Sequence, residues 1–146
     1  MSETLTEAQK ADLAAISACM IPASERYRVP GADDPAIQAD MLATLGRDRG
    51  AVLRALEQLA QLAGGPFSAL PVDRRISIAR QFRAAGGPAV ATLARVVLQT
   101  YYRDDRVVRS LRLEPRAPFP LGHVLEDGDW TLLDPVKARP PMWRLA

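Results

Sequence analysis

Few side chains in this sequence of 146 residues belong to the types that carry out chemistry. His123 is the only histidine and the best candidate for a general base, and it lies in a Pro-Leu-Gly-His turn. Asp129 and Asp134 lie on either side of Trp130, where they can act as an acid/base pair. The same aspartates also suit local structure, because Asp129 can cap a turn and Asp134-Pro135 commonly initiates one. A free-standing enzyme built on these three polar residues therefore remains an alternative function.

The sequence lacks the usual patterns for binding nucleotides and metals. It has no Gly-x-Gly-x-x-Gly fingerprint, no Walker loop and no Gly-x-Ser-x-Gly elbow. The glycine pairs at 64–65 and 86–87 each precede a proline, which favours helix ends over phosphate binding. Cys19 is the single cysteine, so no disulfide can form within the chain, and we expect a buried thiol. We predict no catalytic, cofactor or metal site in this chain.

Helix start and stop signals divide the first three quarters of the chain into five or six short helices. Thr6 and Gln9 form a capping box, and Asp34 followed by Pro35 is a second start signal. The predicted helices run from the Thr6 cap to Pro22 and over 34–46, 51–63, 71–86 and 90–101, with a short turn after Asp104. The residues of the apolar stripes expected to face inward are Leu13, Ile16, Met20, Ile37, Met41, Leu45, Val52, Leu56, Leu59, Leu62, Ile76, Ala79, Phe82, Val90, Leu93, Val97 and Tyr101. The short turn after Asp104 carries Val107, Val108 and Leu111. Residues 1–112 are therefore predicted to form an all-α bundle.

Residues 113–146 differ in character and are predicted to form an extended, mostly irregular docking tail. Six of the twelve prolines lie here, and they exclude regular helix over most of the stretch. Phe119, Trp130 and Trp143 also lie here, whereas disordered segments tend to lack such residues. Ordering this tail costs backbone entropy, which burial of its apolar side chains must offset. The tail packs either across its own bundle or on a second protein, which we favour because tryptophan dominates many interfaces.

The charge pattern gives little reason to expect nucleic acid or a membrane as a partner. The 19 basic and 17 acidic side chains leave a net charge of +2 and are intermixed along the chain. The fourth predicted helix carries Arg74, Arg75, Arg80 and Arg83, which support an alternative function as a helical DNA-binding regulator. No run of roughly 18–20 apolar residues is present to insert into a bilayer. No secretory or twin-arginine signal precedes the domain, so we expect a cytoplasmic chain, with co-export to the periplasm left open.

Short motifs spread over nearly the whole chain can be compared with those of a known protein family. They are Ile16-Ser-Ala-Cys-Met-Ile-Pro22, Val29-Pro-Gly-Ala32, Pro35-Ala-Ile37, Pro66-Phe67 with Leu70, Thr100-Tyr-Tyr-Arg-Asp-Asp105 with Val107 and Leu111, Phe119-Pro-Leu-Gly122, Asp129-Trp-Thr-Leu-Leu-Asp-Pro-Val136, and Arg139-Pro-Pro141. Together they resemble the gluconate 2-dehydrogenase subunit 3 family. The tail is similar to the subgroup that accompanies oxidoreductases of the glucose-methanol-choline type.

The resemblance implies a non-catalytic small subunit bound to a large flavoprotein that oxidises a sugar, a sugar acid or a related alcohol. FAD would then lie in the large subunit, and this chain would have no redox centre. Such a subunit is thought to help the large one fold, remain soluble or be exported, although the twin-arginine signal of many members is missing here. The resemblance leaves open whether a cytochrome subunit completes the assembly.

The residues predicted to bind the partner lie mostly in the tail. Tyr101 continues the apolar stripe of its helix, and Tyr102 points about 100° away from it, where it is available to a partner. The full set comprises Tyr102, Phe119, Leu121, His123, Trp130, Leu133, Pro135, Arg139 and Trp143.

Overall fold

The computed structural model describes residues 4–115 and 127–140. Contacts divide the chain into two compact units, Met1–Pro115 and Arg116–Ala146. The described residues contain no β-strand, and an isolated antiparallel bridge joins Ser24 and Val29. The predicted all-α fold is therefore confirmed.

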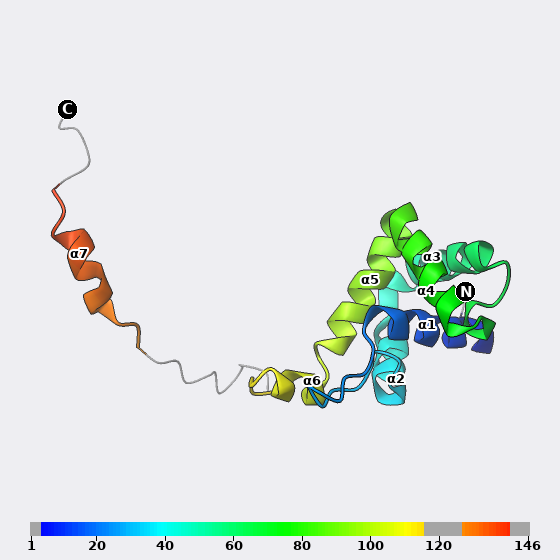
Figure 1. Ribbon diagram of the computed structural model, residues 1–146, viewed down its shortest axis with the longest axis horizontal. Coiled ribbons are helices and arrows are strands. Elements are labelled where there is room, and N and C mark those ends of the chain that lie inside the picture. Colours follow the sequence, from blue (N-terminus) through cyan, green and yellow to red (C-terminus); the bar gives the residue numbers. More distant parts are fainter. Residues whose placement is uncertain (1–3, 116–126, 141–146) are drawn as a thin grey trace. The chain divides into compact units, whose positions relative to one another are not determined.

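The first unit is a bundle of short helices joined by tight breaks. Its elements are α1 (Glu7–Met20), α2 (Pro35–Thr44), the 3-10 helix η1 (Gly46–Asp48), α3 (Arg49–Ala63), the 3-10 helix η2 (Phe67–Ala69), α4 (Val72–Ala85), α5 (Pro88–Tyr101) and α6 (Asp105–Ser110). Figure 1 shows α1 to α5 gathered side by side, with α6 beyond the C-terminal end of α5.

Helix caps define where these elements begin and end. The Thr6 hydroxyl accepts from the Gln9 backbone N–H at 3.2 Å, and the Gln9 side chain accepts from the Thr6 backbone N–H at 2.9 Å. The Asp34 carboxylate accepts from two backbone N–H groups at the start of α2, where Pro35 takes the first position. Gly64 adopts a left-handed conformation (φ 74°) that ends α3. The predicted capping box, the Asp34-Pro35 start and the end of α3 are confirmed.

Helices α3 and α5 form the centre of the core. Helix α3 packs against α5 and α4, α2 packs against α5, and α1 packs against η2 and α4. The largest fully buried apolar side chains are Phe67, Leu13, Ile37, Met41, Leu56, Leu59, Leu93, Val52, Val97 and Val107. All of these except Phe67 and Val107 were predicted to face inward, as was Tyr101, which is also buried. The helix periodicity therefore predicts most of the core.

Two of the residues predicted to face inward are exposed: Leu62 and Ile76. Leu62 lies six residues after the buried Leu56, and Ile76 lies six residues before the buried Phe82. Six residues correspond to about 120° around a helix, so both side chains lie at the edge of the buried stripe. Leu111, named at the end of the predicted turn after Asp104, follows the last residue of α6 and is exposed.

Cys19 also differs from the prediction of a buried thiol. It is half-buried and packs against the edge of the core. Burial raises the pKa of the Cys19 thiol, and the positive charge of Arg75 acts in the opposite direction. Cys19 therefore contributes to packing while part of its surface remains accessible.

The second unit contains two short helical elements among its described residues. The 3-10 helix η3 (Trp130–Leu133) runs directly into α7 (Asp134–Lys137). The proline content did not predict these turns. Pro135 is compatible with them because it lies in the first turn of α7, where a missing N–H removes no hydrogen bond within the helix.

Candidate docking surface

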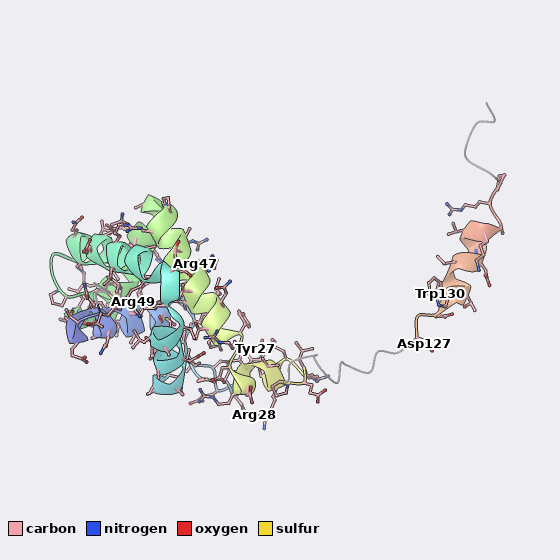
Figure 2. All side chains as sticks on the ribbon, turned by 180° about the vertical axis from the view of Figure 1, so that it is seen from behind. Tyr27, Arg28, Arg47, Arg49, Asp127 and Trp130 are labelled. Carbon is pink, nitrogen blue, oxygen red and sulfur yellow. The ribbon has the colours of Figure 1, made fainter. Side chains whose placement is uncertain are left out.

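The helical segment of the second unit carries a row of exposed apolar side chains, which we call the tail surface: Trp130, Leu132, Leu133 and Val136. Trp130 is 72% exposed and Leu132 is 74% exposed. Trp130 lies on this segment shortly after Asp127 (Figure 2). Trp130, Leu133 and Val136 recur every three residues, which brings them toward the same side of a short helix. Large apolar groups grouped in this way favour contact with another protein.

Polar contacts of Asp129 and Asp134 stabilise the conformation of the helical segment. The Asp129 carboxylate accepts from the Thr131 hydroxyl at 2.6 Å and from the Thr131 backbone N–H at 3.0 Å. These two hydrogen bonds lower the pKa of Asp129 below its ordinary value. Asp134 begins α7 and pairs with Lys137 at 3.3 Å. The two aspartates considered for acid/base chemistry thus have local structural roles, and the capping role predicted for Asp129 is confirmed.

Tyr102 lies at the C-terminal end of α5 in the first unit and is 53% exposed. Its ring packs edge-on against Tyr101, with ring centroids 5.3 Å apart and an interplanar angle of 87°. Tyr101 is buried, and its hydroxyl donates to the Pro30 carbonyl at 3.1 Å. The structure therefore agrees with the predicted division between a core tyrosine and an accessible one.

Arg106 anchors the region beside these tyrosines. Its guanidinium donates to the Asp34 carboxylate at 2.9 and 3.1 Å and to the Asp104 carboxylate at 2.9 and 3.0 Å. Asp34 and Asp104 also cap the N-termini of α2 and α6. Hydrogen bonding to Arg106 is the main cause that lowers the pKa of both carboxyl groups. One arginine therefore joins two helix starts that lie 70 residues apart in the sequence.

Replacing Arg106 with glutamine is expected to reduce stability more at pH 7 than at pH 3. Because the folded-state pKa values of Asp34 and Asp104 are lowered, their contribution is present above the unfolded value of roughly 3.9. This contribution to stability is lost as the pH falls through the folded-state pKa values of the two carboxyl groups. We expect a loss of about 1 kcal/mol at pH 7, because the network is partly exposed to solvent. Urea unfolding at both pH values measures the difference.

Arg109→Gln is the matched control for that measurement, because Arg109 pairs with Asp105 in a more exposed i, i+4 pair. It should change stability by only a few tenths of a kcal/mol at either pH. An equal loss at pH 7 and pH 3 for Arg106→Gln would mean that Arg106 acts through packing of its aliphatic stem.

The predicted partner-binding residues fall into three groups. Trp130, Leu133, Pro135 and Arg139 lie together in the second unit and are exposed, whereas Tyr102 belongs to the first unit. The remaining four lie outside the described residues: Phe119, Leu121, His123 and Trp143. Leu132 and Val136 complete the tail surface. They belong to the apolar residues of the tail but not to the predicted partner-binding set.

The described residues offer little for catalysis or for holding a metal. Residues 4–115 and 127–140 contain no group of three or more His, Cys, Asp or Glu side chains that could hold a metal ion. None of the helices in these ranges combines the length and apolar character needed to cross a membrane. The described geometry therefore adds no support to the free-standing enzyme, whose third residue, His123, lies outside these ranges.

The arginines of α4 do not form one exposed row. Arg74, Arg80 and Arg83 are exposed, whereas Arg75 is half-buried. Arg80 and Arg83 line an apolar groove together with Cys19 and Ile76. Sequence reasoning missed this groove, and the one available signal was the placement of two arginines at the edge of an apolar stripe. The arrangement does not favour the DNA-binding alternative, which needs a continuous cationic face.

Comparisons with protein-family models, with curated proteins and with solved structures found no match to this chain. The residues of the tail surface and the motifs quoted above therefore carry the functional argument.

Proposed function

We propose that this chain is a non-catalytic accessory subunit of a flavin-dependent dehydrogenase or oxidase. In this proposal the tail surface docks on the large, FAD-containing subunit. The observation that carries the proposal is the exposure of Trp130, Leu132, Leu133 and Val136 on a helical segment with its own cap. Tryptophan is the residue type most enriched among those that dominate interface energies.

The size of the tail surface is consistent with a stable contact. Burying a large apolar side chain contributes roughly 1.5–3 kcal/mol. The four side chains together can thus supply on the order of 8 kcal/mol, before the cost of association is subtracted. Residues outside the helical segment, such as Tyr102, would add to this contact.

The class of the partner rests on the sequence motifs. The series from Ile16-Ser-Ala-Cys-Met-Ile-Pro22 to Arg139-Pro-Pro141 resembles a family of small subunits that accompany flavoproteins. Because this chain has no nucleotide-binding fingerprint, FAD is assigned to the large subunit. Oxidation of a sugar, a sugar acid or an alcohol would take place there. This chain would contribute folding, solubility or co-export.

Co-expression with a flavin-dependent oxidoreductase of the glucose-methanol-choline type from the same genome tests the proposal. The two proteins are separated by size-exclusion chromatography, with flavin followed by its visible absorption. We expect the chain to co-elute with a yellow flavoprotein and to increase its soluble yield. Elution of this chain alone, colourless and monomeric, would reject the proposal, and binding to duplex DNA and turnover without a partner would then be tested.

Deletion of residues 116–146 is expected to abolish co-elution while the first unit stays folded. The caps and the buried core described above lie within residues 4–115, so the helical signal per residue and the thermal transition should be preserved. Circular dichroism and chromatography of the shortened chain measure the two effects. Unfolding of the shortened chain would instead mean that the tail acts as a strap within its own molecule.

A further inference from the structure

A groove between α1, α4 and α5 reaches the core of the first unit. Its volume is about 580 Å³, within the range of roughly 300–1,000 Å³ that is typical of small-molecule sites. Ile16, Phe82 and Leu93 are its most buried lining residues. The other apolar lining residues are Cys19, Met20, Ile76, Ala79, Val90 and Ala94. The groove therefore offers an apolar interior that is not filled by the side chains of the bundle.

The charged groups of the groove are all positive. Arg80 and Arg83 are the only charged side chains among the described residues that line it. Their guanidinium groups make no hydrogen bond or ion pair with a described residue, whereas Arg95 and Arg106 each pair with aspartate. Arg75 lies close enough to affect Cys19, and its buried Nε has no hydrogen-bond partner. A ligand with an anionic group would complement these unpaired cations.

The dimensions of the groove favour a small molecule over a partner helix. The lining covers about 6 Å along α1 (residues 16–20), about 6 Å along α5 (residues 90–94) and about 10 Å along α4 (residues 76–83). A docked helix presents anchors over two turns, about 10 Å, a length that only the α4 wall offers, and it has a diameter of 10 Å or more. A single hydrocarbon chain needs much less width.

We propose that this groove binds a free anionic amphipath, such as a fatty acid of medium chain length. The hydrocarbon part would lie against Ile16, Phe82 and Leu93, and the carboxylate would lie beside Arg80 and Arg83. This inference does not depend on the proposed docking function, because the groove and the tail surface belong to different units.

Cys19 provides a direct readout, because it is the only cysteine and lines the groove. The rate of alkylation of the full-length chain by iodoacetamide would be measured against increasing dodecanoate, with dodecanol as the uncharged comparison. We expect dodecanoate to slow alkylation at lower concentrations than dodecanol. The double variant Arg80→Gln/Arg83→Gln should weaken protection by dodecanoate roughly tenfold and leave protection by dodecanol unchanged.

Two further variants sharpen this experiment. Arg74→Gln removes an exposed arginine of α4 that does not line the groove, and it should leave protection by dodecanoate unchanged. Ala79→Phe fills the groove and should abolish displacement of the fluorescent probe anilinonaphthalene sulfonate by dodecanoate, with circular dichroism confirming the fold.

Three results would overturn the proposal. Dodecanoate at millimolar concentration could leave the alkylation rate unchanged. Dodecanoate and dodecanol could protect Cys19 equally, with no effect of the arginine substitutions. The groove would then bind hydrocarbon chains without recognising an anionic group. Cys19 could instead be protected only in a complex with an acidic, apolar partner protein, which would assign the groove to a protein interface.

Discussion

Replacing Trp130 and Leu133 with alanine is expected to abolish stable binding to the proposed flavoprotein partner while the bundle remains folded. Trp130 is the largest exposed apolar side chain of the tail surface, and truncation of a central interface tryptophan typically costs about 2–4 kcal/mol. That loss corresponds to a 30- to 1,000-fold weaker affinity for Trp130 alone. Leu133, one 3-10 turn further on, adds to it. Titration calorimetry or surface binding assays with purified flavoprotein measure the change.

The free chain should tolerate this double substitution. Both residues belong to the second unit, whereas the buried core side chains of the first unit lie within residues 4–115, so the substitutions remove none of that core. Leu98→Ala is a matched control, since Leu98 is an exposed leucine of α5 outside the tail surface, and it should leave affinity unchanged. Wild-type affinity in the Trp130→Ala/Leu133→Ala variant would show that the tail surface is not the docking element.

Local signals explain why the helix boundaries of the first unit follow from the sequence. A cap is a contact within three residues, so Thr6 with Gln9 specifies the start of α1 without knowledge of the fold. The left-handed Gly64 and the Asp34 cap are equally local. Helix α3 begins at Arg49, two residues before the predicted start, because the 3-10 turn η1 leads directly into it. The sequence contains no strong signal for that turn.

Contacts between helices explain the features that could not be predicted. The helix period places Ile76 near the buried stripe of α4, but the packing of α4 against α3 and α1 decides which edge of that stripe is covered. The same packing brings Cys19 of α1 and Arg83 of α4 to one groove, although they lie 64 residues apart. The spacing of residues within one helix does not predict which residues of another helix lie beside it.

The tail shows that amino-acid composition alone does not predict local conformation. Its aromatic residues and prolines predict a docking segment, and the exposure of Trp130 and Leu133 is compatible with that role. Proline content did not predict helical turns over residues 130–137, because the cost of proline depends on its position in the helix. In the first turn, where Pro135 lies, that cost disappears. The consequence is a surface that includes Leu132 and Val136, two residues absent from the predicted set.

Phe67 connects the short element η2 to the core of the first unit. It lies between α1 and α3 and is fully buried. The next residue, Ser68, is held by α1, because the buried Asp12 carboxylate accepts from the Ser68 backbone N–H at 2.8 Å and from its hydroxyl at 2.6 Å. These hydrogen bonds keep η2 in place, so a cavity at Phe67 cannot easily be closed by movement of the backbone.

Phe67→Ala is therefore expected to lower the free energy of unfolding by about 3–5 kcal/mol. This is a large part of the 5–15 kcal/mol that is typical of whole domains, and it should lower the melting temperature by on the order of 15 °C. Thermal and urea unfolding followed by circular dichroism measure the change. Val72→Ala, at an exposed position near the start of α4, should stay within about 0.5 kcal/mol of the wild type. A loss below about 1 kcal/mol for Phe67→Ala would mean that η2 does not pack as a fixed part of the core.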